Sequence, residues 1–514
     1  MINIVEMLEA SAERVPERTA FSDPDGSISF GELLDGSQKI AGRFIDDGCM
    51  NGSGRSVLFY MEKCVDAMPV MFAASYCRAF YCFVDIRQSD ERAADIIKRV
   101  DPSVIVTDEK NSDRLKRIMP DEGRVFMIEE LTDKDTLSKT DLNEDALKTE
   151  RDKFCDRDIL YVNFTSGSTG MPKGVAVSHA SVIDFIQVFT KTFGITGEDI
   201  IANQAPFDFD VSVKDIYSGL YTGATVRLIP REYFSAPTML MDYICDGNTT
   251  VIIWAVTAMC FVSIMNGFDY RCPDSLRLIM FSGEIMPVKQ LNKWMTHIPE
   301  ATYVNLYGPT EITCNCTYHV IERHYENDET IPIGIPFENE KVFLLDEADH
   351  EIVPGSPGME GEICVSGTCV AIGYYKDPEK TAEMFVQNPL NDACYERIYR
   401  TGDLAKYDDE GLLLYCGRKD HQIKHMGQRI ELADIELSAM SVDKVDRTCC
   451  IYDEKKKKII LFYTGDVPKD DLSVILKKKL PEFMVPGKTI QLDAFPMNKN
   501  GKIDRAELGR INSR

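Results

Sequence analysis

An apolar run that leads into a glycine- and hydroxyl-rich loop is the feature of this sequence that most restricts its fold. The run Ile159–Val162 is typical of a strand, and residues 164–174 read Phe-Thr-Ser-Gly-Ser-Thr-Gly-Met-Pro-Lys-Gly. Such a loop can present backbone N–H groups, hydroxyls and a lysine to phosphate oxygens. A flexible surface loop is the alternative, because Gly and Ser are common turn residues. Lys173 is followed by Gly174 and Val175, so the loop is not a Walker phosphate-binding loop.

Length and composition predict a globular protein of more than one lobe. The chain has 514 residues, of which 44% are hydrophobic and 27% charged. It lacks a long apolar run typical of a membrane span and an N-terminal signal peptide, so we expect a cytoplasmic protein with reduced thiols. The pair Cys314 and Cys316 is too closely spaced and isolated to predict a zinc site.

The net charge is strongly negative and unevenly distributed. A total of −25 argues against nucleic acid as a partner. Residues 419–514 contain 19 Lys/Arg and 15 Asp/Glu, a net charge of +4, so residues 1–418 carry −29. A basic segment on an acidic chain predicts docking of an acidic macromolecule near the C-terminal end. The alternative is that the lysines at 455–458 and 477–479 are simply solvated.

The pattern along the chain predicts βα units followed by a β-rich region. Helical periodicity at 1–15 and 30–47 alternates with β-rich runs at 57–60 and 104–106. Further strands are expected at 200–205, 225–229, 251–254, 278–281 and 302–305. The polar stretch 131–158 is expected to be a loosely ordered connector. Gly/Pro turns after residue 330 predict short strands, and a charged break at 417–420 precedes a small separate lobe.

Three more motifs carry groups suited to a nucleotide. In Asn305–Glu311, Tyr307 can stack a base and Glu311 can hold Mg²⁺, although the segment also fits a capped turn that opens a helix. In Tyr399–Leu404, Asp403 can accept from ribose hydroxyls, or the segment is an ordinary β-turn. Asn498–Asp504 contains an Asn-Gly pair and Lys502, and by itself it indicates only a hairpin.

In this order the four motifs resemble those of the adenylate-forming enzymes, namely acyl-CoA synthetases, luciferases and nonribosomal peptide synthetase adenylation domains. The resemblance runs from about residue 10 to the C-terminus, with further marks at 361–363, 373–374, 417–420, 422–424 and 427–432. Asn203–Tyr217 and Phe281–Glu284 look most like the D-alanine–carrier protein ligases. The resemblance implies an α/β fold in which residues 1–417 form a large AMP-binding lobe of βα-layered subdomains plus a β-rich subdomain. Residues 418–514 would form a small, mobile α+β lobe that carries the catalytic lysine.

The implied reaction is that of an AMP-forming amino acid–carrier protein ligase, an acid–thiol ligase. It uses ATP and Mg²⁺ to make an aminoacyl-adenylate, and then transfers the amino acid, D-alanine by resemblance, to a phosphopantetheine thiol. Because two anions must approach each other, positioned cations and N–H donors matter more than a base. The expected partner is an acidic carrier protein supplied in trans, since no carrier segment follows Lys502. We expect a monomer without nucleic acid or membrane insertion.

The resemblance also assigns roles to residues. Lys502, Glu311 and Thr310 would be catalytic: Lys502 would bridge the substrate carboxylate and the α-phosphate, and Glu311 would hold Mg²⁺. The lobes would rotate about Asp420, withdrawing Lys502 and bringing in the Gly427 loop to admit the thiol. The implied ATP ligands are Thr165, Ser166, Gly167, Ser168, Thr169, Gly170, Lys173, Gly283, Glu284, Asn305, Tyr307, Gly308, Thr310, Asp403, Arg418 and Lys502.

The substrate pocket is implied by the same alignment of motifs. Its lining would be Asp210, Val211, Lys214, Ile253, Met280, Ser282, Leu306, Cys314 and Asn315. Asp210 would pair with the substrate ammonium, whereas a fatty-acid ligase needs no such carboxylate. The alternative is that Asp210 is only a turn or cap residue. Lys214 stands where the D-alanine ligases have Met. Because a buried unpaired ammonium is costly, Lys214 either extends to solvent, the simpler option, or meets an anion of a larger polar or acidic amino acid.

Two other functions are alternatives to an amino acid–carrier protein ligase. An acyl- or aryl-CoA synthetase would share the nucleotide motifs, but Asp210 argues against it. A catalytically silent scaffold is disfavoured by the intact Lys502, Glu311 and Asp403. If the chain is an amino acid–carrier protein ligase, the sequence leaves open the identity and chirality of the amino acid and the carrier. It also leaves open the pathway, which could be teichoic acid alanylation or the synthesis of a peptide or another metabolite.

Overall fold

The computed structural model describes most of the chain as two compact units. The described residues are 1–50, 54–119, 124–165, 172–326, 329–356, 358–419, 422–454, 456–496, 503 and 505–513. The first unit comprises 1–83, 100–163 and 174–419, and the second comprises 84–99, 164–173 and 420–514.

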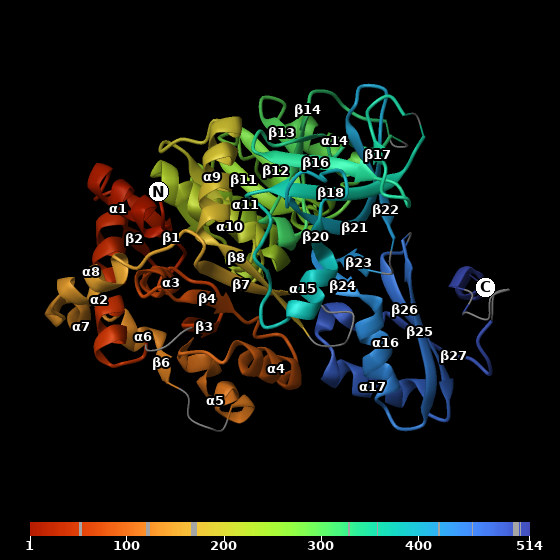
Figure 1. Ribbon diagram of the computed structural model, residues 1–514, viewed down its shortest axis with the longest axis horizontal. Helices are drawn as coiled ribbons and strands as arrows, with labels where there is room; N and C mark the ends of the chain where they lie inside the picture. The colour runs from red at the N-terminus through yellow and green to blue at the C-terminus, as the bar shows by residue number, and fades with distance from the viewer. Residues whose placement is uncertain are drawn as a thin grey trace. The chain divides into compact units, whose positions relative to one another are not determined.

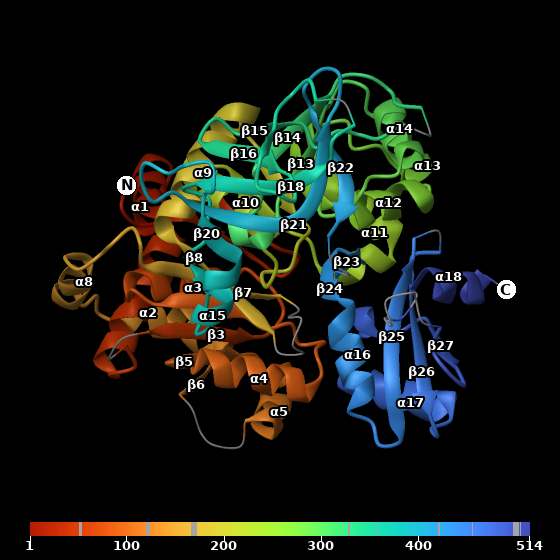
Figure 2. The same cartoon turned by 45° about the vertical axis from the view of Figure 1, so that its right-hand side comes forward.

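A nine-stranded sheet forms one layer of the first unit (Figures 1 and 2). Its order is β15-β14-β13-β12-β11-β9-β10-β1-β2. The central strands are parallel and confirm the predicted ones: β9 (Ile200–Asn203), β10 (Thr225–Leu228), β11 (Val251–Ala255), β12 (Leu278–Ser282) and β13 (Thr302–Tyr307). β1 (Thr19–Ser22) is parallel to β10, whereas β2 (Ser27–Ser29), β14 (Thr317–Ile321) and β15 (Ile335–Pro336) are antiparallel to their neighbours.

A seven-stranded sheet carries the strand before the glycine-rich loop. Its order is β19-β8-β7-β4-β3-β5-β6, with β7 (Ile159–Thr165) and β8 (Lys173–Ser178) on either side of the loop. The other strands are β3 (Ser56–Tyr60), β4 (Phe80–Phe83), β5 (Val104–Thr107), β6 (Val125–Met127) and β19 (Gly373–Tyr374). The predicted strands at 57–60, 104–106 and 159–162 are therefore confirmed.

Helices pack on these sheets with signals that the sequence carries. α1 (Val5–Arg14) and α2 (Phe30–Asp46) match the predicted helices, and α2 begins with a capping box between Ser29 and Glu32. α9 (His179–Phe193) is capped by Ser178, packs against α10 (Val211–Thr222), and α10 in turn contacts β9 and β11. α10 ends at Gly223, whose φ of 80° is in the left-handed region that glycine adopts without strain.

The region after residue 330 forms a mostly antiparallel sheet, as predicted. β16 (Glu340–Leu345), β17 (Glu351–Ile352), β18 (Gly361–Gly367), β20 (Phe385–Gln387) and β21 (Arg397–Tyr407) run in the order β17-β16-β18-β21-β20, and β22 (Leu413–Arg418) pairs with β21. The short helix α15 (Pro378–Met384) lies beside β19 and β20.

The prediction of a loosely ordered connector at 131–158 is wrong. Two helices occupy it, α7 (Lys134–Lys139) and α8 (Glu144–Arg151). The side chains of Asp133 and Asn143 cap their N-termini, which satisfies backbone donors that polar composition alone does not reveal. Glu150 of α8 also accepts a hydrogen bond at 2.6 Å from Arg55, and this contact holds the helix against the rest of the unit.

The second unit has the α+β composition expected for the C-terminal segment. It contains the hairpin of β23 (Gln422–His425) and β24 (Gln428–Glu431), and the sheet of β25 (Val445–Asp453), β26 (Lys458–Gly465) and β27 (Lys488–Gln491). Its helices are α16 (Leu432–Met440), α17 (Lys469–Lys479) and α18 (Arg505–Ser513). Most of α4 (Asp90–Val100), from an earlier part of the chain, also belongs to this unit. Ile430, Leu461 and Leu472 lie in its buried apolar core.

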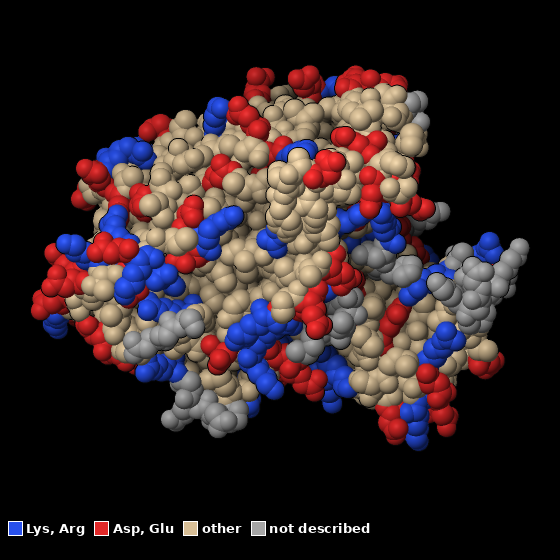
Figure 3. All heavy atoms as spheres, in the orientation of Figure 1, with Lys and Arg blue, Asp and Glu red and all other residues tan. Residues whose placement is uncertain are grey.

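Surface charge is mixed on the face of the molecule that Figure 3 shows. Figure 3 shows acidic and basic side chains intermingled over one face of the molecule. Among the described residues, no helix has the length and hydropathy required to cross a bilayer.

Glu340 at the start of β16 predicts a pH-dependent stability. Its carboxyl is buried, it accepts from the Cys369 thiol, and its Oε1 has no hydrogen-bond partner among the described residues. Burial, reinforced by the Asp184 carboxylate, raises the pKa of Glu340 from 4.5 to about 8. Because the native state holds a proton that the unfolded chain releases, the associated stability is complete below pH 4.5 and is lost as pH rises to about 8.

Glu340→Gln should remove this pH dependence, since glutamine resembles the protonated acid. At about pH 9 the variant should exceed the wild type in free energy of unfolding by about 2–4 kcal/mol. Denaturant midpoints measured from acidic to alkaline pH would test this. Glu338→Gln is a matched control, because Glu338 is 71% exposed and pairs with Lys191 at the surface. Parallel pH profiles for Glu340→Gln and the wild type would contradict the prediction.

Candidate functional site

The carboxyl ends of four parallel strands meet at one edge of the nine-stranded sheet. Ala255 of β11, Ser282 of β12 and Leu306 of β13 are neighbours in register, and Asn203 ends β9. Two residues earlier along β11 and β12, Ile253 lies beside Met280. In open α/β sheets, ligands bind outside the carboxyl ends of the strands. The structure therefore brings four predicted pocket residues, Ile253, Met280, Ser282 and Leu306, to the edge where a ligand is expected.

A close turn after β13 brings Cys314 and Asn315 to the same edge. The turn passes through the short 3-10 helix η2 (Thr310–Ile312) and returns to Tyr307 with a 2.8 Å hydrogen bond from Cys316 N. A Cβ on Gly308 would lie 2.5 Å from Asn315 Cα and 2.6 Å from Cys314 O, so only glycine fits. Thr313 and Cys314 have φ values of 53° and 77°, which are strained for residues with a Cβ.

Asp210 lies at the N-terminus of α10, against this turn. The Cys314 thiol donates to the Asp210 carbonyl oxygen at 3.1 Å, and Asp210 is 7% exposed. Asp210 occupies the N-cap position, but its carboxylate makes no side-chain cap hydrogen bond. Asp210 thus occupies the cap position of the alternative, but its side chain does not cap the helix. Val211, the next pocket residue, is also buried.

The option that Lys214 extends to solvent is wrong. Its side chain is 0% exposed, and its ammonium donates to Asn315 Oδ1 at 2.5 Å. The cause is position: Lys214 is one helical turn after Asp210, so both project from the same face of α10, which packs into the unit. Burial lowers the pKa of Lys214, while Cys314 and Asp210 oppose this shift.

A polar network that the sequence did not predict supports the start of α10. The Lys63 ammonium donates to Asn203 Oδ1 at 2.7 Å and to the carbonyl oxygens of Asn203, Gln204 and Ala205. Asn203 Nδ2 donates to Asp215 Oδ2 at 2.7 Å. Burial raises the pKa of Asp215 to about 7. The network joins the loop after β9 to α10, and no local sequence signal connects Lys63 with either.

Three of the predicted nucleotide ligands contact one another. Tyr307 OH donates to Asp403 Oδ2 at 2.6 Å, and Arg418 Nη1 donates to Asp403 Oδ1 at 2.6 Å. Asp403 is 1% exposed and lies within β21, opposite Arg418 of β22, so the alternative of an ordinary β-turn is wrong. Burial and the Asp403 carboxylate raise the pKa of Tyr307 well above its usual value, so its hydroxyl stays protonated and donates.

Glu311 has surroundings that fit a Mg²⁺ ligand. It is 1% exposed in η2, and its Oε1 accepts from Tyr374 OH of β19 at 2.8 Å. Mg²⁺ takes oxygen ligands and commonly uses one or two carboxylates together with substrate phosphates. Among the described residues, no group of three or more His, Cys, Asp or Glu could hold a metal by itself. As a single buried carboxylate, Glu311 fits a Mg²⁺ ion that also takes phosphate oxygens of a nucleotide. The sequence marked Tyr374 as part of the family motif at 373–374 but did not predict its contact with Glu311.

The remaining predicted ATP ligands of the first unit lie near the same strand ends. Gly283 and Glu284 follow β12, where Gly283 has a φ of 96°, and Thr310 opens η2. Asn305 of β13 directs its amide to Pro332 O at 2.8 Å. In the structure, the Asn305 side chain therefore holds the loop at residue 332.

The second unit places Lys173 beside a carboxylate. Lys173 Nζ lies 3.5 Å from Glu431 Oε1, which also accepts from Gln422 Nε2 at 2.5 Å. Thr165 ends β7 on the other side of the loop. The loop itself, Ser166–Gly170, and the two C-terminal predictions, Asp420 and Lys502, lie outside the described residues.

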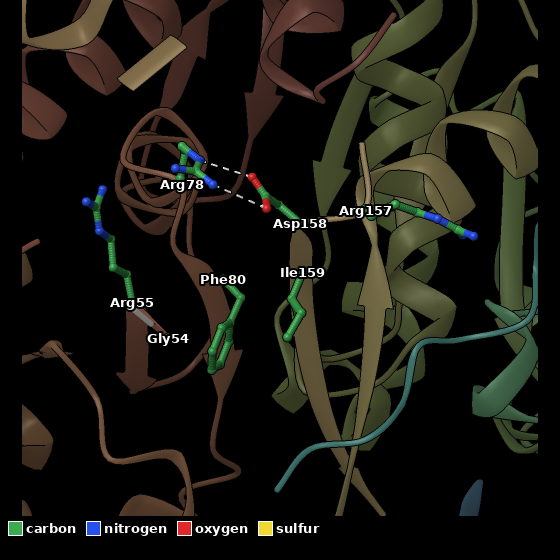
Figure 4. Close-up of a pocket in the computed structure, with 7 residues that line it drawn as sticks. All are labelled: Gly54, Arg55, Arg78, Phe80, Arg157, Asp158 and Ile159. Atoms are coloured by element: carbon green, nitrogen blue, oxygen red, sulfur yellow. Dashed lines mark hydrogen bonds and ion pairs between the residues drawn. The ribbon is translucent and has the colours of Figure 1, made fainter. Parts of the chain in front are cut away.

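A separate cavity of about 390 Å³ in the first unit is rich in arginine but does not have the chemistry of an anion site (Figure 4). Figure 4 shows Arg78 directed at Asp158 and Arg157 directed away from it. Arg78 Nε lies 3.1 Å from Asp158 Oδ2. Arg55 is paired with Glu150 at 2.6 Å. Of the three arginines that line the cavity, Arg55 and Arg78 are thus already paired with carboxylates.

Comparison with known proteins identifies the family. The AMP-binding enzyme family model matches residues 8–375. Surfactin synthase subunit 1 of Bacillus subtilis (strain 168) is 30% identical over 510 residues, which cover 98% of this chain and 14% of that protein. Bacitracin synthase 1 of Bacillus licheniformis is 31% identical over 510 residues, which cover 98% of this chain and 9% of that protein. The chain thus spans only a small part of these relatives.

Solved structures share the fold. An adenylation domain of Vibrio cholerae in complex with glycyl-adenosine-5'-phosphate matches with a TM-score of 0.84 and 22% identity, covering 100% of this chain and 98% of that one. The o-succinylbenzoate CoA synthetase of Bacillus subtilis matches with a TM-score of 0.83 and 20% identity, covering 99% and 98%. The family match over residues 8–375 and the shared fold agree with the nucleotide-binding motifs. The chain therefore belongs to the AMP-binding enzyme family.

Proposed function

We propose that this enzyme activates an amino acid with ATP and passes it to the phosphopantetheine thiol of a carrier protein. The observation that carries the proposal is Asp210: a buried carboxylate at the sheet edge that does not cap its helix. An α-ammonium is a cation that a buried carboxylate in this position can bind. An acyl chain offers no equivalent group.

In the first step, an oxygen of the substrate carboxylate attacks the α-phosphorus of ATP, and the bond to pyrophosphate breaks. Tyr307 lies against the adenine, while Asp403, oriented by Arg418, accepts from the ribose hydroxyls. Glu311, which accepts a hydrogen bond from Tyr374, would hold Mg²⁺, and the metal would neutralise phosphate charge. Residues 165–170 and Lys173 hold the pyrophosphate, and Lys502 bridges the carboxylate and the α-phosphate.

In the second step, the thiol sulfur attacks the acyl carbon and AMP leaves. We assign residues 1–417 to the AMP-binding domain and 418–514 to a mobile domain that turns about Asp420 between the steps. The charge of +4 on residues 419–514 supports docking of an acidic carrier. The relatives support this partner class, since solved structures of this fold include an adenylation and carrier-domain protein.

The resemblance to D-alanine–carrier protein ligases makes D-alanine the default substrate. The buried Lys214 favours the alternative of a larger polar or acidic amino acid, because the methyl group of alanine offers nothing to an ammonium.

Two assays test the proposal. ATP–pyrophosphate exchange should depend on an amino acid and should be absent with the fatty or aryl acid that lacks the amine. Thioester formation should require a phosphopantetheinylated carrier protein. Efficient AMP release with CoA and an acid without an amine would instead identify an acyl- or aryl-CoA synthetase.

A further inference from the structure

Two opposite charges lie one helical turn apart on the buried face of α10. Asp210 and Lys214 are 7% and 0% exposed. Residues four apart on a helix are neighbours, with Cβ atoms about 5–6 Å apart. Two groups of opposite charge at this spacing match a ligand that itself carries both charges.

Lys214 has hydrogen-bonding capacity left for a ligand. An ammonium has three N–H donors. Among the described residues, the Lys214 ammonium makes one hydrogen bond, to the neutral Asn315 amide, and the Asp210 and Asp215 carboxylates favour its charged form without forming an ion pair with it. A buried charge without an opposite charge in contact costs several kcal/mol, so an anion that enters here is strongly stabilised.

The charge balance of the cluster points to the same ligand. Asp215 interacts electrostatically with both Lys214 and Lys63 and is linked to Lys63 through Asn203, so the two lysines balance Asp210 and Asp215 when all four are ionised. If a substrate ammonium pairs with Asp210, Lys214 is left as the uncompensated cation. A second carboxylate on the substrate restores neutrality, whereas its first carboxylate is the one that reacts with ATP.

Tyrosine hydroxyls make the same region polar. Tyr81, Tyr161 and Tyr217 are buried, and Tyr217 OH donates to Tyr81 OH at 3.1 Å. The Tyr161 hydroxyl has no hydrogen bond of standard geometry with a described residue. Burial, the Cys314 thiol and the Asp210 carboxylate raise its pKa, which places it beside the cluster as a neutral donor. An aliphatic substrate side chain would leave the Tyr161 hydroxyl unpaired.

We propose that Lys214, supported by Asn315, binds the side-chain carboxylate of the substrate, and that the substrate is a dicarboxylic amino acid. This inference rests on the proposed amino acid activation. It names Lys214 as the residue that determines specificity and Asp210 as the residue that reads the amine.

The first experiment compares substrates with the full-length wild-type enzyme. ATP–pyrophosphate exchange would be measured with both enantiomers of aspartate, glutamate and 2-aminoadipate, and with asparagine, glutamine, alanine and lysine. A dicarboxylic amino acid should exceed its own amide by about 100-fold in kcat/KM. Strong exchange with alanine or another uncharged amino acid, and not with any dicarboxylic one, would overturn the inference and leave the proposed function intact. Exchange with no amino acid would contradict both.

The second experiment changes Lys214. Lys214→Met should lower kcat/KM for the dicarboxylic substrate by about 100-fold, mainly through KM for the amino acid, while KM for ATP stays within about twofold. For the uncharged amide substrate kcat/KM should change little, so the variant should no longer prefer the acid over its amide. Lys214→Arg keeps the charge and should retain that preference even if overall activity falls.

A matched control separates this role from folding. Lys191→Met removes a lysine of the neighbouring helix α9 that is 71% exposed, and it should leave both substrates unchanged. Thermal unfolding of each variant reports on stability. If Lys214→Met lowers exchange with acidic and uncharged substrates equally, Lys214 serves only to brace the turn at Asn315, and the inference is wrong.

Discussion

Asp210→Asn should lower kcat/KM for the amino acid in ATP–pyrophosphate exchange by about 100- to 1,000-fold, because breaking a buried charge pair costs about 3–5 kcal/mol. KM for ATP should change little, since Asp210 faces the amine and not the nucleotide. The structural reason is that the Asp210 carboxylate is buried and makes no cap hydrogen bond. Asparagine keeps its shape and removes only the charge.

The measurement includes a control for a structural role. If the Asp210 side chain merely capped α10, asparagine would serve as well, because Asn and Asp are equally good caps. Asp108→Asn provides the matched comparison, since the Asp108 side chain does cap its helix, accepting from Asn111 N at 2.8 Å. Both variants should fold alike, and only Asp210→Asn should lose the preference for the amino acid over its deaminated analogue. An unchanged preference would refute the assignment of Asp210.

Asp403→Asn is expected to reduce kcat/KM for ATP by about 100-fold and to lower stability as well, since it removes the charge-assisted hydrogen bond to the largely buried Arg418. Asp403 joins Tyr307 and Arg418 through hydrogen bonds of 2.6 Å, and Arg418 has a side chain only 9% exposed. The loss of charge therefore disturbs both the orientation of Tyr307 and the group that meets the ribose.

A nucleotide series distinguishes binding from folding in this variant. The wild type should discriminate against 2′- and 3′-deoxy-ATP, and Asp403→Asn should lose that discrimination at a temperature well below its melting point. Asp349→Asn is the matched control, because Asp349 also accepts from an arginine, Arg400, but is 46% exposed. It should behave as the wild type. Retained discrimination in Asp403→Asn would show that the carboxylate does not contact the ribose.

Local sequence was a good guide wherever periodicity or turn chemistry decides structure. The apolar runs at 200–205, 251–254 and 278–281 are strands because a buried parallel strand is apolar on both faces. The stretch 131–158 was wrongly predicted to be a loosely ordered connector because its polar composition resembles that of a loop. Its two helices depend on the caps Asp133 and Asn143.

Burial of a charged side chain was beyond local reasoning. Sequence left Lys214 with two options, and the simpler one was wrong. Its position on α10 follows from helical periodicity, but which face of α10 packs inward depends on α9, β9 and β11. A lysine extends to solvent only if its helix face is near the surface.

The sequence by itself determined the pattern of strands and the order of the nucleotide motifs, and it predicted Asp210 and Asp403 as site carboxylates. Only the tertiary structure decided their contacts: Lys214 with Asn315, 101 residues away, and Glu311 with Tyr374, 63 residues away. Each pair joins the turn after β13 to another element, helix α10 for Lys214 and strand β19 of the seven-stranded sheet for Tyr374. Their partners are set by packing over the whole unit, which no local periodicity encodes.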